Sequence, residues 1–240
     1  MEKVIAMIPA RYAASRFPAK LMQPLGDRPV IAHTYEAAKN SGLFDQVYVV
    51  TDSDIIFREI TERGGKALMS TGHHESGTDR IAEAAAGLDA EIIVNVQGDE
   101  PFIQKEPLEK LVRLFEDPAV RVASLMRRME DPADASNTNM VKVVTSKKGR
   151  ALYFSRSRIP YPREGGTPAD YFLHIGVYAF RKEALLAFTQ LPQAPLELTE
   201  KLEQLRFLYH DIDIYMAETR YTNIAIDTPE DLEKALQMIK

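Results

Sequence analysis

The 240-residue chain contains no cysteine and no tryptophan. The lack of cysteine excludes disulfide bonds, thiolate metal ligands and thiol chemistry, and it favours a cytoplasmic protein. No apolar run approaches the ~20 residues that a membrane-spanning helix needs, so we expect no membrane insertion. The charged residues Glu2 and Lys3 precede only a short apolar segment, and we therefore expect no signal peptide.

An excess of positive charge is also missing. The chain carries 30 Lys and Arg residues against 35 Asp and Glu residues, which gives a net charge of −5. A general nucleic-acid-binding protein is basic, so we expect no nucleic-acid partner. A local basic pocket for a nucleotide is still compatible with this balance.

Two common phosphate-binding motifs are absent. The sequence contains neither G-x-x-x-x-G-K-[ST] nor G-x-G-x-x-G. A function as a P-loop ATPase or as a dinucleotide-dependent dehydrogenase is therefore disfavoured.

What is present is an alternation of strand-like and helix-like segments. Apolar runs of strand type lie at 4–8, 46–50, 67–69, 91–96 and 120–126, and helical segments are expected at 29–41, 55–63 and 106–116. This order predicts an α/β fold with a mostly parallel, Rossmann-like sheet and crossover helices.

The pattern changes after residue 126. Short β-type runs at 140–145, 151–154 and 171–180 predict an antiparallel arm over about 127–180. This arm could form a dimer contact, or its aromatic residues could equally cap the active site. Helices are expected at 182–190 and 196–209, a strand at 213–217, and a last helix that Thr228 caps and Pro229 begins. A length of 240 residues predicts a single domain, 1–240, into which this arm is inserted.

A loop at 9–20 follows the first expected strand and carries three cations, Arg11, Arg16 and Lys20. Loops at the carboxyl ends of parallel strands bind ligands, and small residues between the cations let the backbone approach an anion. Long loops without regular structure are uncommon in compact domains and are often functional. We predict a phosphate-binding loop; the alternative is a solvated basic loop.

Two carboxylates are candidate metal ligands. Asp99 follows the strongly apolar strand at 91–96, and Asp227 ends a second short apolar run. Mg²⁺ usually takes one or two protein carboxylates together with substrate oxygens, although each residue could instead serve a turn or a cap. Cations for phosphate and carboxylates for Mg²⁺ are together the requirements of nucleotidyl transfer.

Several further side chains have both a structural and a functional interpretation. Ser76 and Gly77 open a helix, where free N–H groups could bind a base or phosphate, or where Ser76 could simply cap. His174 lies in a β-type run, where a histidine is more often structural. Arg156 is a surface charge or a carboxylate ligand. Glu203 and Gln204 lie on the polar side of a leucine-rich helix.

Several motifs, in this order, resemble those of the CMP-sugar synthetase family. They are IPARYAASRFPAK (8–20), HHESGTDR (73–80), NVQGDEP (95–101), ALYFSRSRIPY (151–161), HIGVYAFRKEAL (174–185), LEQLR (202–206) and IDTPEDLEKA (226–235). The whole set is similar to the branch that activates Kdo, 3-deoxy-D-manno-octulosonate. Val177 and Ala179 stand where Ile and Gly are usual, and Gln193-Ala194 replaces Pro-Ser, but these changes are conservative or lie in an expected loop.

The resemblance implies a sheet of the nucleotide-diphospho-sugar transferase kind, a homodimer and a Mg²⁺-dependent reaction. In that reaction CTP and Kdo give CMP-Kdo and pyrophosphate, for lipopolysaccharide synthesis. The implied catalytic residues are Arg11, Arg16, Lys20, Asp99 and Asp227, with Asp99 and Asp227 as the metal ligands. The implied CTP-binding residues are Pro9, Ala10, Arg11, Ser15, Arg16, Lys20, Ser76, Gly77, Arg80, Gln97 and Asp99. The implied Kdo-binding residues are Gln97, Arg156, His174, Tyr178, Glu203 and Gln204.

Three alternatives are open at this stage. The same chemistry could act on another acidic sugar, either sialic acid or 8-amino-Kdo. A transferase that uses UTP or GTP is disfavoured, because such enzymes tend to carry a G-x-G-T-R-type loop. A binding protein without activity is disfavoured by the joint presence of Lys20, Asp99 and Asp227.

Overall fold

The computed structural model describes residues 2–13, 17–72, 74, 76–164, 169–222 and 224–239. The chain forms two compact units, one made of Met1–Leu108 with Thr222–Lys240 and the other of Glu109–Tyr221. Helix α4 (Lys105–Arg113) runs across the boundary between them. The second unit includes the whole of the expected arm, and the division into a single domain with an insertion stays a prediction.

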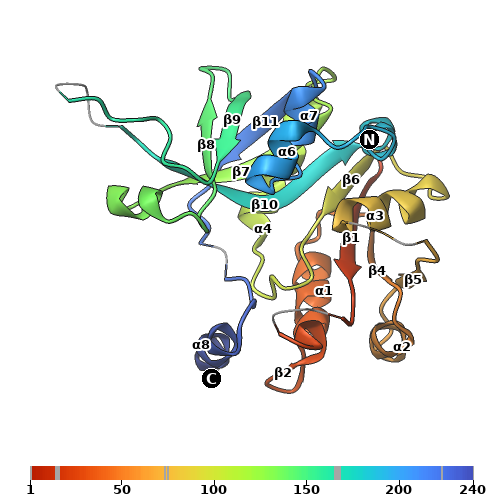
Figure 1. The fold of residues 1–240 in the computed structure, drawn as a ribbon. Coiled ribbons are helices and arrows are strands. Elements are labelled where there is room, and N and C mark those ends of the chain that lie inside the picture. The colour runs from red at the N-terminus through yellow and green to blue at the C-terminus, as the bar shows by residue number, and fades with distance from the viewer. Residues whose placement is uncertain are drawn as a thin grey trace. The chain divides into compact units, whose positions relative to one another are not determined.

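The first unit is built on a parallel sheet (Figure 1). Its strand order is β6 (Ile92–Asn95), β1 (Val4–Ala10), β4 (Gln46–Thr51) and β5 (Ala67–Met69). Helices α1 (Val30–Asn40), α2 (Asp54–Glu62) and α3 (Gly77–Ala86) connect the strands. The predicted alternation of strands and helices in this part of the chain is confirmed.

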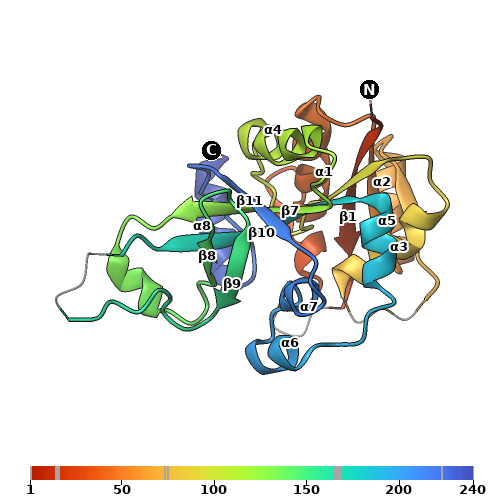
Figure 2. The same ribbon diagram turned by 90° about the horizontal axis from the view of Figure 1, so that it is seen from above.

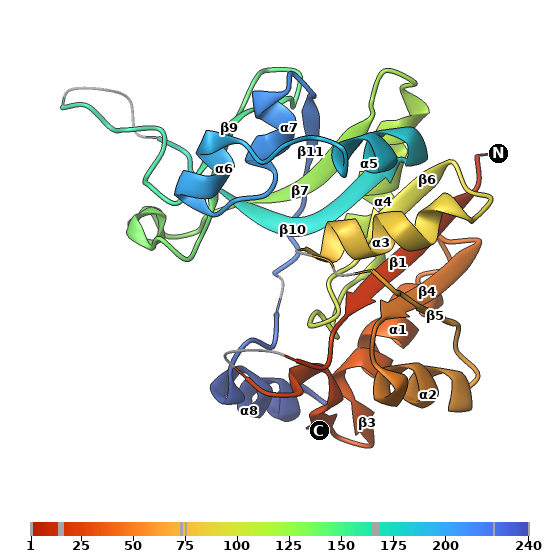
Figure 3. The same cartoon turned by 45° about the vertical axis from the view of Figure 1, so that its right-hand side comes forward.

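The direction of each connection decides which face its helix covers. The first two crossovers lead outward from β1 to β5, and the third returns past β1 to β6. Right-handed crossovers therefore put α1 and α2 on one face of the sheet and α3 on the other (Figure 2). Helix α3 lies along β1 (Figure 3). With both faces covered, the centre of β1 is buried, as its uninterrupted apolar sequence requires.

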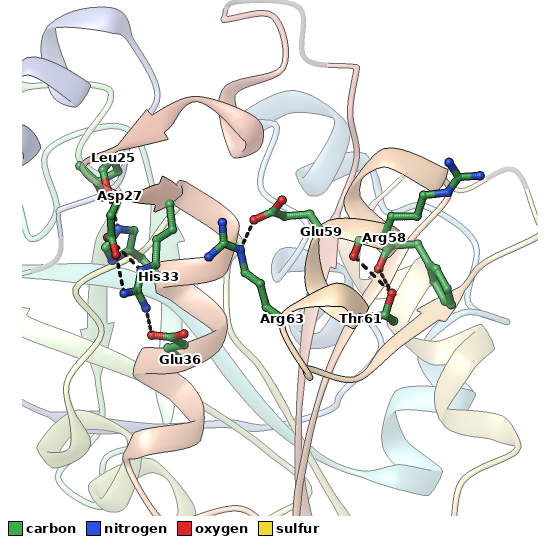
Figure 4. Close-up of polar contacts among 10 residues, drawn as sticks. Leu25, Asp27, His33, Glu36, Arg58, Glu59, Thr61 and Arg63 are labelled. Carbon is green, nitrogen blue, oxygen red and sulfur yellow. Dashed lines mark hydrogen bonds and ion pairs between the residues drawn. The ribbon is translucent and has the colours of Figure 1, made fainter.

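A small hairpin, which was not predicted, joins the end of the cationic loop to α1. Lys20 begins a 3₁₀ turn (Lys20–Met22), and strands β2 (Pro24–Leu25) and β3 (Arg28–Pro29) follow. The His33 ring on α1 lies 2.6 Å, Nε2 to O, from the Leu25 carbonyl (Figure 4). Arg28 also pairs with Glu36. Pro29 is the N-cap of α1 and not its first residue.

The last helix, α8 (Pro229–Met238), belongs to the first unit. Thr228 caps it, since its hydroxyl accepts from the Asp231 N–H at 3.2 Å. The Asp231 carboxylate in turn accepts from the Thr228 N–H at 3.0 Å. This reciprocal capping box confirms the predicted cap at Thr228 and the predicted start at Pro229.

The second unit contains a mixed sheet. Its strand order is β11 (Ile214–Glu218), β7 (Val122–Arg128), β10 (Phe172–Arg181), β8 (Lys142–Thr145) and β9 (Ala151–Ser155). Strand β11 is parallel to β7, whereas β7, β10, β8 and β9 pair antiparallel. The β8–β9 hairpin (Figure 1) falls where the antiparallel arm was expected, which confirms that part of the fold class.

Short helices complete the second unit. They are the 3₁₀ turns Leu114–Glu116 and Pro132–Ser136, and α5 (Lys182–Phe188), α6 (Pro195–Glu200) and α7 (Leu205–Tyr209). The prediction of one helix over 196–209 is wrong. Lys201 takes the left-handed conformation, with φ of 54°, and separates α6 from α7.

The physical reason for this break is tertiary. The turn lets Arg206 fold back onto Glu197, with Nη2 to Oε1 at 2.5 Å and Nε to Oε2 at 2.8 Å. Both side chains are buried, and the guanidinium also lies 4.4 Å from the Phe188 ring centre. A continuous helix would hold the two residues nine positions apart on one rod, so this bidentate pair requires the turn.

We expect Glu197→Ala to destabilise the second unit by roughly 3–5 kcal/mol, because it leaves a buried guanidinium without its carboxylate. Urea denaturation followed by circular dichroism measures the change. Arg113→Ala is the matched control, since its pair with Glu109 is exposed and should contribute no more than about 1 kcal/mol. Equal effects of the two changes would contradict the role given to the buried pair.

Candidate active site

A pocket of about 200 Å³ lies in the first unit, at the carboxyl ends of β1 and β6. This edge of a parallel sheet is where a ligand site was expected. The predicted residues in its lining are Pro9, Ala10, Arg11, Lys20, Ser76, Gly77, Arg80, Gln97, Asp99 and Asp227. Phe17, Leu21, His74 and Gly98 also line it and were not predicted. The predicted residues Ser15 and Arg16 lie outside the described residues.

Lys20 and the two predicted metal ligands meet in this pocket. The Lys20 ammonium donates to Asp99 Oδ2 at 2.5 Å and to Asp227 Oδ1 at 2.8 Å. Burial lowers the pKa of Lys20, but the charges and hydrogen bonds of Asp99 and Asp227 outweigh it, so the pKa is raised overall. Lys20 is therefore charged at neutral pH. Its positive charge is offset by Asp99 and Asp227, which lie 79 and 207 positions away in the sequence.

The same arrangement fits a small divalent cation. One oxygen from each aspartate faces the same point, the position of the Lys20 ammonium, and a divalent cation near that point could be shared by both carboxylates. Among the described residues, no group of three or more histidine or carboxylate side chains could hold a metal. An ion here would complete its shell with substrate oxygens and water, as Mg²⁺ commonly does.

Backbone contacts hold the two aspartates beside each other. The Ile226 N–H donates to the Asp99 carbonyl at 2.9 Å, which ties the segment before Asp227 to the loop after β6. Thr34 on α1 donates its hydroxyl to the Gly98 carbonyl at 2.9 Å. These two bonds explain how residues from distant parts of the sequence reach one point.

Two glycines of the pocket lie so close to Pro9 that a side chain in their place would be tightly packed against it. A Cβ on Gly98 would lie 3.0 Å from the Pro9 carbonyl oxygen, and one on Gly77 would lie 3.0 Å from Pro9 Cγ. The loop after β6 therefore lies close to the Pro9 backbone, and the start of α3 lies close to the Pro9 ring. Gly98 could have been recognised as a pocket residue from the sequence, because a glycine directly after a central strand often marks a close approach of the backbone to another group.

Ser76 caps α3, as its structural interpretation predicts. Its hydroxyl accepts from the Asp79 N–H at 3.1 Å and donates to the Asp79 carboxylate at 3.0 Å. Its role in nucleotide binding stays a prediction. Arg80 is buried and donates to Asp52 Oδ2 at 2.7 Å and to the Ser70 hydroxyl.

Glu83 on α3 holds the loop that carries His74 into the pocket. Its carboxylate accepts from the Thr71 N–H at 3.1 Å, the Thr71 hydroxyl at 2.9 Å and the Gly72 N–H at 3.3 Å. The His74 ring lies 2.5 Å away, Nε2 to Oε2. The Thr71 N–H is the main cause that lowers the pKa of Glu83 to about 2.

In the second unit, several of the residues predicted to bind the sugar lie together. His174 and Tyr178 have ring centres 5.4 Å apart, and Gln204 Nε2 lies 3.5 Å from His174 Nδ1. Burial lowers the pKa of His174 to about 3. Burial, and then the charge of Glu203, raise the pKa of Tyr178 well above its ordinary value. Both side chains are therefore neutral hydrogen-bonding groups.

Arg156, also predicted to bind the sugar, has another environment. Its guanidinium donates to the carbonyls of Glu200 at 2.8 Å, Thr138 at 3.1 Å and Lys201 at 3.4 Å. Its own carbonyl accepts from the buried Lys142 ammonium at 2.5 Å. In this structure Arg156 joins the chain segments around α6, and its role toward a ligand stays a prediction.

Comparison with known proteins agrees with the resemblance found in the motifs. A family model described as cytidylyltransferase matches residues 5–214. Among the described residues, no helix combines the length and the apolar character that crossing a membrane requires.

Two curated relatives match nearly end to end. The chain is 57% identical over 241 residues to a 3-deoxy-manno-octulosonate cytidylyltransferase of Flavobacterium johnsoniae, with 99% of each chain covered. It is 52% identical over 240 residues to the protein of the same name in Christiangramia forsetii, with 99% of this chain and 97% of the relative covered.

Solved structures also resemble this one. A structure of CMP:2-keto-3-deoxy-manno-octonic acid synthetase complexed with CTP has a TM-score of 0.94 at 40% identity, covering 99% of this chain and 98% of that one. A 4-diphosphocytidyl-2C-methyl-D-erythritol synthase from Anaerococcus prevotii has a TM-score of 0.66 at 19% identity, covering 99% and 98%, and it shows the fold alone.

We expect Glu83→Gln to lower the melting temperature at neutral pH but not at strongly acidic pH. A carboxylate with a depressed pKa contributes stability above its unfolded value, 4.5, and loses it as the pH falls toward about 2. The gap in melting temperature between the parent protein and the variant should therefore narrow from pH 6 to pH 3. Exposed Glu62→Gln is the control; a Glu83→Gln gap that stays constant or widens would contradict the assignment.

We expect Lys20→Met to bind Mg²⁺ more tightly than the parent protein does in the absence of nucleotide. The change removes the ammonium that otherwise competes for Asp99 and Asp227, and two facing carboxylates then attract a cation more strongly. Mg²⁺-dependent shifts in melting temperature measure this, with exposed Lys105→Met as the control. Weaker Mg²⁺ binding in Lys20→Met than in the parent would argue against a metal between these carboxylates.

Proposed function

The chain belongs to the cytidylyltransferase family, and we propose that it transfers CMP from CTP to Kdo and releases pyrophosphate. The relatives that match it over their full length are named for this reaction. The single observation within the molecule that supports it best is the meeting of Lys20, Asp99 and Asp227 in one pocket. Such a site can hold a polyphosphate and stabilise the charge that develops on a leaving group.

In the proposed reaction the anomeric hydroxyl of the sugar attacks the α-phosphorus of CTP in line. A new oxygen–phosphorus bond forms, the bond to the β-phosphate bridge breaks, and pyrophosphate leaves with its negative charge. The hydroxyl proton passes to solvent. No covalent bond to the protein is needed, so the site acts mainly by positioning and electrostatics.

The charged residues of the first unit have complementary roles in this proposal. Lys20 and Arg11 offset the charge of the triphosphate, with Arg16 predicted to join them. Asp99 and Asp227 would hold Mg²⁺, which supplies neutralising charge and lowers the pKa of a bound hydroxyl. Ala10, Ser76, Gly77 and Gln97 would line the cytidine pocket, with Pro9, Ser15 and Arg80 beside them.

The residues predicted to bind the sugar differ in character from these. His174, Tyr178 and Gln204 are neutral, which suits the hydroxyls of a sugar, and Glu203 lies close enough to influence Tyr178. Arg156 would pair with the sugar carboxylate, for which its fork-shaped guanidinium is suited. The homodimer, the cytoplasmic location and the role in lipopolysaccharide synthesis are parts of this proposal that rest on the family resemblance.

We expect pyrophosphate release with CTP and Mg²⁺ when Kdo is the acceptor, and none with sialic acid or 8-amino-Kdo. Release with another acid would keep the chemistry and change the acceptor. A folded protein that binds CTP but releases nothing with any of the three would overturn the proposed activity.

The same assay tests the metal ligands. Asp99→Asn and Asp227→Asn should each lower kcat/KM by about 10²–10³-fold, as expected for loss of one electrostatic contact to a developing charge. Asp89→Asn is the control, because Asp89 is exposed and pairs only with Lys3 at 3.2 Å among the contacts described. Near-normal activity of Asp99→Asn would exclude it as a ligand.

A further inference from the structure

An irregularity in strand β10 shapes the cluster that contains His174. The register pairs Ile175 with Leu125 on β7 but then pairs Tyr178 with Ser124. Gly176 and Val177 are therefore extra residues on β10, and they form a bulge. Bulges bend a strand and change the direction of its side chains, and they are common beside active sites.

The bulge brings His174 and Tyr178 together. In a regular strand residues four positions apart are separated by roughly 13 Å, from a rise of about 3.3 Å per residue. Here the two ring centres are 5.4 Å apart. The Phe154 ring also meets the imidazole edge-on at 5.0 Å, so the imidazole is packed on two sides.

The hydroxyl of Ser124 occupies the inside of this bulge. Its Oγ lies 2.9 Å from the Val177 carbonyl oxygen, 3.2 Å from the Ile175 carbonyl oxygen and 3.0 Å from His174 Nε2. Ser124 is fully buried, so no solvent competes for these contacts. One side chain thus joins both edges of the bulge to the imidazole.

The proton count at Ser124 determines the tautomer of His174. A serine hydroxyl has one proton to donate, and a carbonyl oxygen can only accept. If the hydroxyl donated to Nε2, its own lone pairs would face two buried carbonyl oxygens that lack this partner. If it donates to Val177, the shorter contact, it can accept from a protonated Nε2, so the hydroxyl, the Val177 carbonyl and the imidazole nitrogen all have partners.

The contact on the opposite side of the His174 ring is consistent with the Nε2–H tautomer. With the proton on Nε2, the second nitrogen, Nδ1, is an acceptor, and the amide nitrogen of Gln204 lies 3.5 Å from it. The low pKa of His174, about 3 because of burial, keeps the ring neutral at working pH. Nδ1 therefore carries a lone pair and not a proton.

We propose that Ser124 is a positioning residue for the acceptor sugar. Through the bulge it holds His174 as the Nε2–H tautomer and keeps Nδ1 as an acceptor, which faces the Gln204 amide in this structure and accepts from a sugar hydroxyl in its place when the sugar is bound. This inference rests on the proposed function, in which His174 and Gln204 bind Kdo. Ser124 itself touches no substrate and acts through His174.

The tautomer can be measured directly in the parent protein. With ¹⁵N-labelled histidine, long-range ¹H–¹⁵N spectra distinguish a protonated nitrogen from one with a lone pair, and His174→Gln identifies the signals. We expect His174 as the Nε2–H form from pH 6 to pH 8. An Nδ1–H form, or a mixture of the two, would overturn the proposal whatever the variants do.

The variants separate a positioning role from a purely structural one. Ser124→Ala should mix the tautomers and raise KM for Kdo about three- to tenfold, the effect of one neutral hydrogen bond, with KM for CTP unchanged. Ser124→Thr keeps the hydroxyl and should restore the tautomer and the KM for Kdo, even if its extra methyl lowers the melting temperature.

The matched control is Ser41→Ala. Ser41 is also buried, and its hydroxyl donates to a backbone carbonyl, that of Ala38, at 2.6 Å. It should lose stability without any change in the KM for Kdo. If Ser124→Ala changed the KM for both substrates equally, or changed stability alone, Ser124 would be structural only.

Failure of this inference is distinguishable from failure of the proposed function. If the parent protein releases no pyrophosphate with Kdo, the proposed function fails, and the spectra then decide the tautomer alone. If the parent is active and Ser124→Ala keeps its single tautomer and its KM for Kdo, the positioning role fails and the proposed function stands.

Discussion

The rest of the first unit depends on the need to neutralise one partly buried charge, the Lys20 ammonium. The Lys20 ammonium lies between Asp99 and Asp227, which reach it from the loop after β6 and from the segment before α8. A partly buried ammonium or carboxylate is costly without its partner, so these three side chains constrain three distant segments at once. The hairpin behind Lys20, the glycines against Pro9 and the capping box of α8 all serve to keep these segments in place.

The cluster around His174 in the second unit depends on neutral hydrogen-bonding groups and not on an ion pair. Burial keeps these groups neutral, and the bulge in β10 decides which of them donate and which accept. Behind it, stacked rings connect Tyr178 through Phe180 and Phe207 to Phe188, which also packs against the buried Arg206. A rigid support of this kind suits recognition of hydroxyl groups, because their hydrogen bonds depend on direction more than on net charge.

Much of the fold could be predicted because its signals are local. The apolar run from Val4 to Ile8 predicts a buried strand, and the residue types of Thr228-Pro229 predict the start of a helix. The break at Lys201 and the hairpin before α1 were missed for the opposite reason. The helical period continues across Lys201, but the turn there allows the tertiary ion pair between Glu197 and Arg206, which no local pattern indicates.

The sequence by itself determined the alternation of strands and helices, the family and the chemical types of the site residues, because periodicity, caps and motifs are properties of neighbouring residues. Only the tertiary structure decided that Asp99 and Asp227 both accept from the Lys20 ammonium. It also decided that the Arg156 guanidinium donates to backbone carbonyls and that the Ser124 hydroxyl contacts the His174 ring. These contacts join residues far apart in the chain, and their geometry depends on register, bulges and loop closure. No local pattern encodes those, since each is a balance of interactions over the whole unit.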